Sequence, residues 1–373
     1  MAGASDRAIF VTHSRFLEPE GGGVQVCNRE YIATLKAADF ELRPVTYEFS
    51  HGLIARVCSR IAPRVWYTKE PPRLFESVVQ ALIDTGAQYI FFGHTAFASL
   101  SRRLQKKFPN LRQVLLSHGV EGLDFCIDQH TRREAGTENH FRIVAERMLG
   151  RILLEQMSQR RCFYAVLTLS PFEVEIEKWL GCAKSLWLPR TIAEDPLDWQ
   201  PIDQRVGCVS TLDHTPNHEG LIKLFDQLEG SVPSEFRFRL VGAPPDKGAA
   251  IAQRYSFVDY LGRLSNRQLR IEAATWCCFV HPMFLYAKGC STKLAIAIGW
   301  GLPIATTKYG SRGYRWDRLV LPVADSPASL ATFIQMRAHR ERFEKYRRET
   351  AQIRALSPTI SEIGFEIRRF LGT

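Results

Sequence analysis

Several motifs that mark metal, redox and dinucleotide sites are missing from this sequence of 373 residues. Its nine cysteines form no Cys-x-x-Cys pair and no cluster with histidine, so neither a zinc centre nor a disulfide framework is predicted. Scattered reduced thiols are instead expected, as in a cytosolic protein. No Gly-x-Gly-x-x-Gly spacing occurs, so a dinucleotide cofactor is not indicated.

Long hydrophobic runs are also missing. No apolar stretch approaches the roughly 20 residues that span a bilayer. Residues 1–7 lack the apolar core of a signal peptide. There is no low-complexity tract and no evident repeat. We therefore expect a cytoplasmic globular protein, and the length predicts two domains that each bury a core.

The charge balance is basic. Lys and Arg number 49 against 39 Asp and Glu, for a formal net charge of +10. Such an excess favours anionic partners such as nucleotides, lipid phosphates or a membrane surface. A nucleic-acid partner is not expected, because the chain shows no clustered basic and aromatic motif of a recognisable reader.

The segment 276–307 carries the strongest local signals. Aromatic, cysteine and β-branched residues at 276–280 are typical of a buried parallel strand. Gly289 permits a turn, and Ser291 and Thr292 stand where helix N-cap residues belong. The pattern predicts strand, loop, helix, strand. The loop would deliver unpaired amide groups and the positive end of a helix dipole to an anion, although an ordinary capped crossover is the simpler alternative.

With Lys293-Leu294 and Gly301-x-Pro303, this segment resembles the C-terminal signature of GT-B glycosyltransferases. These enzymes use nucleotide sugars and are α/β proteins in which two Rossmann-like domains face a central cleft. A subset, including glucuronosyltransferases of exopolysaccharide synthesis, is similar in having Ser-x-Lys-Leu here. The resemblance implies that Lys293 contacts the donor diphosphate.

The chain departs from the pattern at two places. Many retaining members of the family carry two glutamates eight positions apart, where this sequence has Lys288 and Ile296. The retaining subtype is therefore not implied. The absence of any Asp-x-Asp argues against the metal-dependent, single-domain transferase fold, so the resemblance implies neither a metal nor a cofactor.

Further donor contacts follow from the resemblance. A polar loop at 210–217 replaces the basic loop of some relatives, and the strand and turn at 258–264 resemble those that hold the nucleobase. The implied diphosphate residues are Lys293, Ser291, Thr292, Gly289, Ser210, Asn217, Gly22 and Gly23. The implied nucleobase or sugar residues are Tyr260, Leu261, Gly262, Arg263, Lys288 and Gly242. Pro-Asn before a helix is also a plain N-terminal signal, so the loop alone does not decide the matter.

Acceptor-side candidates lie in the first half of the chain. Strands at 88–92 and 112–117 would deliver His94 and His118 to the same sheet edge, the ligand side of open α/β sheets. The Ser-His-Gly-x-Glu sequence resembles the cleft-facing segment of GT-B enzymes, which implies catalytic roles for His118, Asp124 and Glu121. In an inverting enzyme one of the three would be the general base. His13 and His94 are acceptor-side candidates, and a satisfied surface histidine is the alternative at each.

One long helix is predicted at 138–161, apolar on one side and ringed by arginines on the other. One interpretation is a membrane-surface helix that brings the enzyme to a lipid-linked acceptor on the cytoplasmic membrane face. The alternative is a core helix with a solvated face. Of the two, the sequence favours the core helix.

The predicted organisation has four parts. Residues 1–190 form an N-terminal Rossmann-like acceptor domain and 191–204 a linker. Residues 205–345 form a C-terminal Rossmann-like nucleotide-sugar domain, and 346–373 a helix crossing back. The predicted function is metal-independent transfer of a sugar from a nucleoside diphosphate to a glycan, lipid-linked or small-molecule hydroxyl. A nucleotide-sugar epimerase and a catalytically degenerate binding subunit are the alternatives. Base, sugar, acceptor and stereochemistry stay open.

Overall fold

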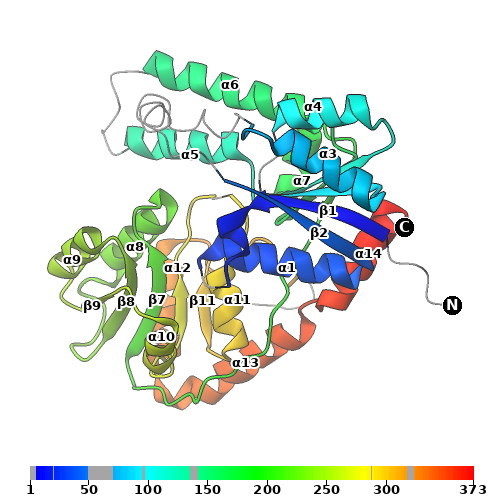
Figure 1. Cartoon of the computed structure of the whole chain (residues 1–373). Coiled ribbons are helices and arrows are strands. Elements are labelled where there is room, and N and C mark those ends of the chain that lie inside the picture. Colours follow the sequence, from blue (N-terminus) through cyan, green and yellow to red (C-terminus); the bar gives the residue numbers. More distant parts are fainter. Residues whose placement is uncertain are drawn as a thin grey trace. The chain divides into compact units, whose positions relative to one another are not determined.

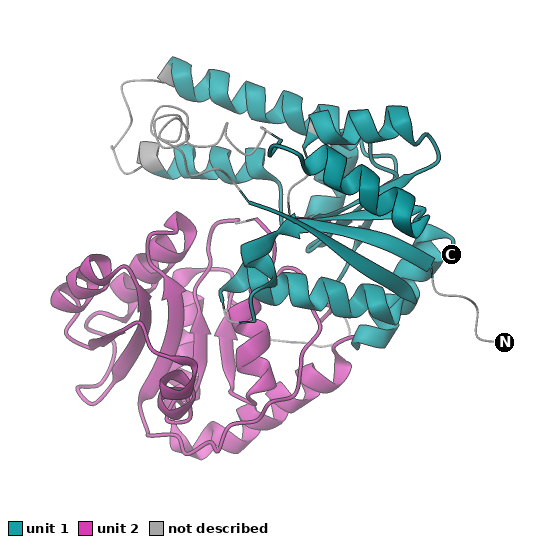
Figure 2. Cartoon of the chain, viewed as in Figure 1, with its two compact units in different colours: residues 1–189, 359–373 teal, residues 190–358 magenta. Residues whose placement is uncertain are grey.

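The computed structural model of the chain (Figure 1) describes residues 6–19, 21–48, 70–94, 97–134, 142–286, 288–316 and 323–373. It divides into two compact units (Figure 2). Residues 1–189 together with 359–373 form the first unit, and residues 190–358 form the second. The sequence also shows an irregular basic stretch at 51–69 and favours a strand at 320–323. Both fall wholly or mostly outside the described residues, as does the start of the helix predicted at 138–161.

The first unit is built on a six-stranded parallel sheet in the order β2-β1-β3-β4-β5-β6. Its central strands β1, β3, β4 and β5 carry buried apolar runs, as expected when helices cover both faces of a parallel sheet, whereas half of the residues of the edge strand β2 are exposed. Ile90, Phe91 and Phe92, for example, are completely buried. The strands are β1 Asp6–His13, β2 Phe40–Tyr47, β3 Tyr89–His94, β4 Arg112–Ser117, β5 Ala165–Thr168 and β6 Ser185–Trp187.

The helices of the first unit include the last one of the chain. Gly364 in that helix, α14, lies so close to α1 that an added Cβ would meet the Ala37 Cβ at 2.8 Å. The Tyr164 hydroxyl also donates to the Leu371 carbonyl at 3.2 Å. The helical elements are η1 Ser14–Leu17, α1 Gly23–Ala37, α3 Leu74–Thr85, α4 Ala98–Lys107, α5 Glu121–Glu134, α6 Arg142–Arg160, α7 Pro171–Trp179 and α14 Ile360–Leu371.

The second unit is built on a five-stranded parallel sheet in the order β11-β10-β7-β8-β9. Its strands are β7 Arg205–Thr211, β8 Arg237–Ala243, β9 Val258–Gly262, β10 Phe279–His281 and β11 Ile304–Thr306. Its helical elements are α8 Thr215–Leu228, α9 Pro245–Arg254, α10 Asn266–Ala273, α11 Thr292–Gly299, α12 Pro327–Ala338, η3 Arg340–Arg342 and α13 Phe343–Leu356. Two parallel sheets with flanking helices confirm the predicted α/β class.

The unit boundaries differ from the predicted ones at two places. Residues 191–204 pack onto the second unit instead of standing apart as a linker: Leu197 is buried, and the Trp199 indole donates to the Trp276 carbonyl at 2.7 Å. At the other end α13 stays with the second unit, and only residues 359–373 join the first. Within the described ranges, no helix is long and apolar enough to cross a membrane.

Candidate functional site

The loop between β10 and α11 forms the candidate anion site of the second unit. Gly289 has a φ of +70°, which explains why glycine stands at this turn. Ser291 is the N-cap of α11, and its hydroxyl accepts from the Leu294 amide at 3.4 Å. Thr292 is the first helical residue and is buried. The strand, loop, helix and strand therefore occur where the sequence predicts them.

Lys293 occupies the second position of α11. Part of its side chain reaches solvent, but burial of the ammonium group lowers its pKa, with the Cys208 thiol opposing the shift. Among the described residues Lys293 has no ion-pair or hydrogen-bond partner. A desolvated cation without a counter-charge is costly, and here it adds to the positive end of a helix dipole. The arrangement suits an anionic ligand.

His281 ends β10 beside this cation. It is only 4% exposed, and its Nε2 has no hydrogen-bond partner in the described part of the chain. Burial, together with the charges of Lys293 and Arg312, lowers its pKa to about 3, so the imidazole is neutral at physiological pH. The sequence reasoning missed His281. Its one visible signal was a polar residue at the end of an otherwise apolar strand.

Arg312 ties the loop in place. Its guanidinium donates to the Gly289 carbonyl at 2.9 Å and to the Lys288 carbonyl at 3.4 Å, and lies 5.4 Å from the Tyr286 ring centroid. The Tyr314 hydroxyl donates to the Ser291 carbonyl at 2.5 Å. These contacts fix the approach to α11, which is the rigid support that a binding loop needs.

The other implied donor residues of the second unit lie at the carboxyl ends of β7, β8 and β9. Ser210 pairs with Gly242, where an added Cβ would meet the Ser210 carbonyl oxygen at 1.9 Å. The Tyr260 hydroxyl donates to the Gly242 carbonyl at 2.9 Å. Because parallel strands share one carboxyl edge, these residues lie on the same side of the sheet as the α11 N-terminus. The close approach of the Ser210 backbone therefore explains the glycine at 242 without any contact to a ligand.

Three further implied residues, Leu261, Gly262 and Arg263, lie at the end of β9. Gly262, at the end of β9, has a φ of +68°. Leu261 packs against the core formed with Trp276 and Leu294, whereas Arg263 is exposed.

Asn217 sits differently from the prediction. Helix α8 begins at Thr215, with Pro216 inside its first turn, instead of at Asn217. The Asn217 side chain donates to the Thr211 carbonyl at 3.1 Å. Its amide group therefore bridges the turn between β7 and α8, and its predicted contact with phosphate stays a prediction.

His118 follows β4 in the first unit. Its Nε2 lies 3.3 Å from Oδ1 of Asn28, a buried residue of α1, and its ring meets Tyr31 edge-on at 5.5 Å. The Asn28 amide nitrogen donates to the Thr12 hydroxyl at 3.4 Å, so its oxygen faces the histidine. Nε2 of His118 must then be the donor, and neutral His118 carries its lone pair on Nδ1. Nothing in the sequence pointed to Asn28.

The other predicted residues of the first unit lie around the same sheet edge. Glu121 and Asp124 fall in the first turn of α5 and are half-buried. His94 ends β3 and pairs in register with Ser117, so the strands that lead to His94 and His118 are neighbours and end at the same sheet edge. His13, at the end of β1, accepts from the Arg15 amide at 3.1 Å through Nδ1.

Gly22 is the N-cap of α1 and Gly23 its first residue. Neither has a positive φ. Their predicted diphosphate role stays a prediction. Among the residues that the structure describes, no three His, Cys, Asp or Glu side chains cluster as metal ligands would.

Comparison with known proteins supports the fold. No family model and no curated protein sequence matches this chain. Solved structures, however, are similar to it. A glycosyltransferase from Rickettsia africae ESF-5 matches at 10% identity over 99% of this chain and 99% of its own, with a TM-score of 0.61. Sucrose-phosphate synthase from Thermosynechococcus elongatus matches at 14% identity over 98% of this chain and 94% of its own, with a TM-score of 0.59.

A third similar structure is a mutant of S. aureus TarM in complex with fondaparinux, alpha-GlcNAc-glycerol and UDP. It is 10% identical, covering 80% of this chain and 59% of that one, with a TM-score of 0.53. The chain therefore has the GT-B glycosyltransferase fold that its sequence resembles.

Proposed function

We propose that this protein is a glycosyltransferase that moves a sugar from a nucleoside diphosphate donor to a hydroxyl acceptor. The observation that carries the proposal is Lys293, a desolvated ammonium with no counter-charge among the described residues, placed at the N-terminus of α11. A diphosphate supplies the missing negative charge. The fold similarity to glycosyltransferases, and the UDP named with S. aureus TarM, agree with this ligand.

Sugar transfer leaves negative charge on the departing nucleoside diphosphate. Groups fixed in advance around that charge lower the barrier, because they need no reorganisation during the reaction. We assign this role to the Lys293 ammonium, the α11 amides and the hydroxyls of Ser291 and Thr292. Neutral His281 lies beside them and adds no repulsive or competing charge.

The acceptor hydroxyl must lose a proton as it attacks the anomeric carbon. We assign the general base to His118, since the proton on Nε2 faces Asn28 and leaves a lone pair on Nδ1. Glu121 and Asp124 are the alternative bases.

Nucleotide binding is tested by thermal shift with UDP, GDP, dTDP and CMP. Stabilisation grows with the ratio of ligand concentration to Kd, about 2.7 kcal/mol at a ratio of 100, so the correct base should stand out. Lys293→Ala should remove most of that shift. Lys308→Ala is the matched control, because Lys308 is an exposed lysine of the same unit. An undiminished shift in Lys293→Ala would refute the assignment.

Catalysis is tested by release of nucleoside diphosphate from nucleotide sugars. His118→Ala should keep the nucleotide thermal shift and lose turnover by about 10²- to 10⁴-fold, the usual contribution of a general base. A wild-type protein that binds nucleotide but releases none would instead be a binding subunit. Conversion of the donor sugar to its epimer would identify an epimerase.

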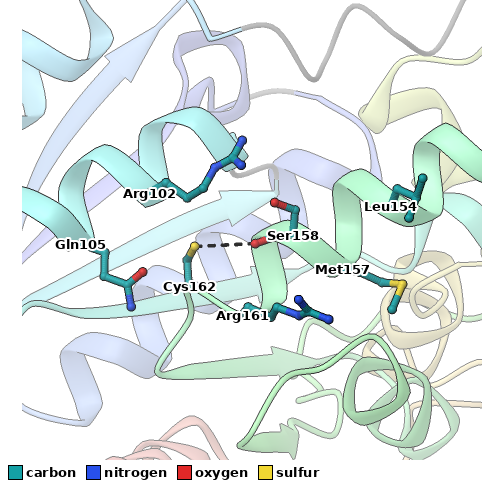
Figure 3. Close-up of a pocket in the computed structure, with 7 residues that line it drawn as sticks. All are labelled: Arg102, Gln105, Leu154, Met157, Ser158, Arg161 and Cys162. Carbon is teal, nitrogen blue, oxygen red and sulfur yellow. Dashed lines mark hydrogen bonds between the residues drawn. The ribbon is translucent and has the colours of Figure 1, made fainter.

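We also propose that the first unit contacts an anionic membrane surface. Helix α4 carries four basic residues and no acid: Arg102, Arg103, Lys106 and Lys107. Between α4 and the end of α6 lies a groove of about 360 Å³ (Figure 3), lined by Arg102, Gln105, Leu154, Met157, Ser158, Arg161 and Cys162. Leu154 is 69% exposed. Guanidinium groups beside exposed apolar side chains match a lipid with a phosphate headgroup.

Cosedimentation with vesicles tests this contact. Binding to vesicles with anionic phospholipid, and not to neutral ones, is expected. The double variant Arg102→Ala/Arg161→Ala should bind about 30-fold more weakly, at about 1 kcal/mol for each basic residue. Arg267→Ala/Arg348→Ala removes two exposed arginines of the second unit and serves as the control. Equal binding by both double variants would exclude the groove as the contact.

A further inference from the structure

A buried ion pair lies behind the His118 strand end. Arg160, the last residue of α6, is 4% exposed, and Glu177 of α7 is completely buried. Two parallel contacts join them: Arg160 Nε to Glu177 Oε2 at 2.5 Å, and Nη2 to Oε1 at 2.8 Å. The remaining guanidinium nitrogen, Nη1, donates to Gln159 at 3.1 Å. The pair therefore has the bidentate geometry of the strongest arginine contacts.

The pair reaches the His118 loop through Ser117. The Ser117 hydroxyl donates its single proton to Glu177 Oε1 at 3.4 Å, and accepts from the Gly119 amide at 3.2 Å. On the other side the Tyr31 hydroxyl donates to the Ser117 carbonyl at 2.8 Å. Gly119 has a φ of +119°, a conformation that needs glycine. The peptides on both sides of His118 are thus held from α7 and from α1.

Electrostatics keep this arrangement charged. Burial lowers the pKa of Arg160, but the Glu177 carboxylate outweighs burial, with a smaller contribution from Glu121 in the first turn of α5. The pKa of Arg160 therefore ends above its ordinary value. A buried pair is weak evidence for stability, because well-packed apolar residues of similar size often serve as well. The feature that matters here is the Glu177 carboxylate, which accepts the hydrogen bond of the Ser117 hydroxyl.

We infer that Arg160 and Glu177 are positioning residues that fix the ring orientation of His118 through Ser117 and Gly119. The inference rests on the proposed function of His118 as the general base. Without the Glu177 carboxylate, the Ser117 hydroxyl is free to rotate toward another acceptor, and the Gly119 amide loses its partner. The loop then relaxes, and the Nε2 contact with Asn28 is no longer held in one geometry.

The test combines nuclear magnetic resonance of the His118 ring with steady-state kinetics. Ring nitrogen signals report tautomer and pKa, and His118→Gln assigns them. The main variant is Arg160→Met/Glu177→Leu, which removes both charges together and so leaves no buried charge without its counter-charge. Ser117→Ala removes only the hydroxyl link. Glu175→Gln is the control, because it breaks the exposed Glu175–Lys178 pair on the same helix.

The double variant should keep a Tm close to that of the wild type while its His118 signals shift to a mixture of tautomers. Its kcat should fall about 10- to 100-fold, the scale of a misplaced catalytic group, with KM for the donor unchanged. Ser117→Ala should shift the same signals, and it decides the matter if the double variant does not fold. Unchanged His118 signals in a folded variant overturn the inference. Shifted signals in a protein with no transferase activity uphold the positioning and refute only the proposed function.

Discussion

Replacement of Lys293 by methionine should make the ligand-free protein more stable while it weakens nucleotide binding. Methionine keeps the length and the apolar stem of lysine, so it opens no large cavity. It removes a desolvated charge that has no partner among the described residues. A residue retained for stability would behave in the opposite way.

The magnitude follows from the burial. A buried polar or charged group left without its partner costs about 1–3 kcal/mol. For a domain of this size each kcal/mol corresponds to about 2–4 °C, so the Tm of Lys293→Met should rise by about 2–10 °C. Loss of a charged hydrogen bond to phosphate, about 1.5–3 kcal/mol, should weaken nucleotide binding about 10- to 100-fold.

The pH dependence gives an independent check. The pKa of Lys293 in the folded protein lies below its unfolded value of about 10.4. Between these two values the unfolded chain binds more protons, so wild-type stability rises with pH. Below the folded pKa the full cost of the charge is present. The stability advantage of Lys293→Met should therefore be largest near neutral pH and shrink as the pH approaches 10.

Differential scanning fluorimetry between pH 7 and 10, with and without the nucleotide that binds, measures all of these quantities. Lys308→Met, on the exposed surface of the same unit, should change neither the ligand-free Tm nor the nucleotide shift. The reasoning fails if Lys293→Met lowers the ligand-free Tm, or if the nucleotide shift survives the substitution.

Three more outcomes are expected. Since the pKa of His281 is about 3 when folded and about 6.5 when unfolded, wild-type stability should fall as the pH drops from 6.5 toward 3. The slope contributed by His281 approaches 1.4 kcal/mol per pH unit, and urea titrations of His281→Gln should show a flatter profile. Gly220→Ala would place a Cβ 1.9 Å from the Pro282 carbonyl oxygen and should cost at least ~1–3 kcal/mol in urea denaturation. Gly150→Ala in α6, with nothing within 4 Å, should instead gain about 0.5–1 kcal/mol, and equal effects of the two would contradict the packing argument.

The elements around the α11 site were predictable because their signals are local. An N-cap serine at 291, a glycine at 289 and an apolar strand before them predict the loop and helix without knowledge of the rest of the fold. The same holds at the end of β4, where a strand delivers His118 to the carboxyl edge. At both sites the candidate functional residues follow a strand in the chain, so finding the end of that strand leads to them.

The predicted unit boundaries differ from those of the structure where tertiary packing, and not the local sequence, determines which unit a segment joins. Prolines and acids at 191–204 suggested a solvated linker, yet Leu197 and Trp199 anchor it to the second unit. Helical periodicity from 327 onward suggested a crossing helix from 346, although Pro358 separates α13 from α14. The capping box of Thr359 and Glu362 marks the true start of the returning helix.

The buried cations of this protein fall into two kinds. Some are paired with a carboxylate of the same chain, and Lys293, among the described residues, is not. Arg160 and Arg337 are both almost completely inaccessible, and each lies within 2.9 Å of a carboxylate, Glu177 and Glu349 respectively. The folded chain thus supplies each of these two guanidinium groups with a carboxylate counter-charge. Lys293 is less completely buried, but burial still lowers the pKa of its ammonium group, and no carboxylate of the described chain pairs with it. A cation kept out of water at the N-terminus of α11, at a cost that folding does not offset, is best explained by a counter-charge that arrives with the ligand.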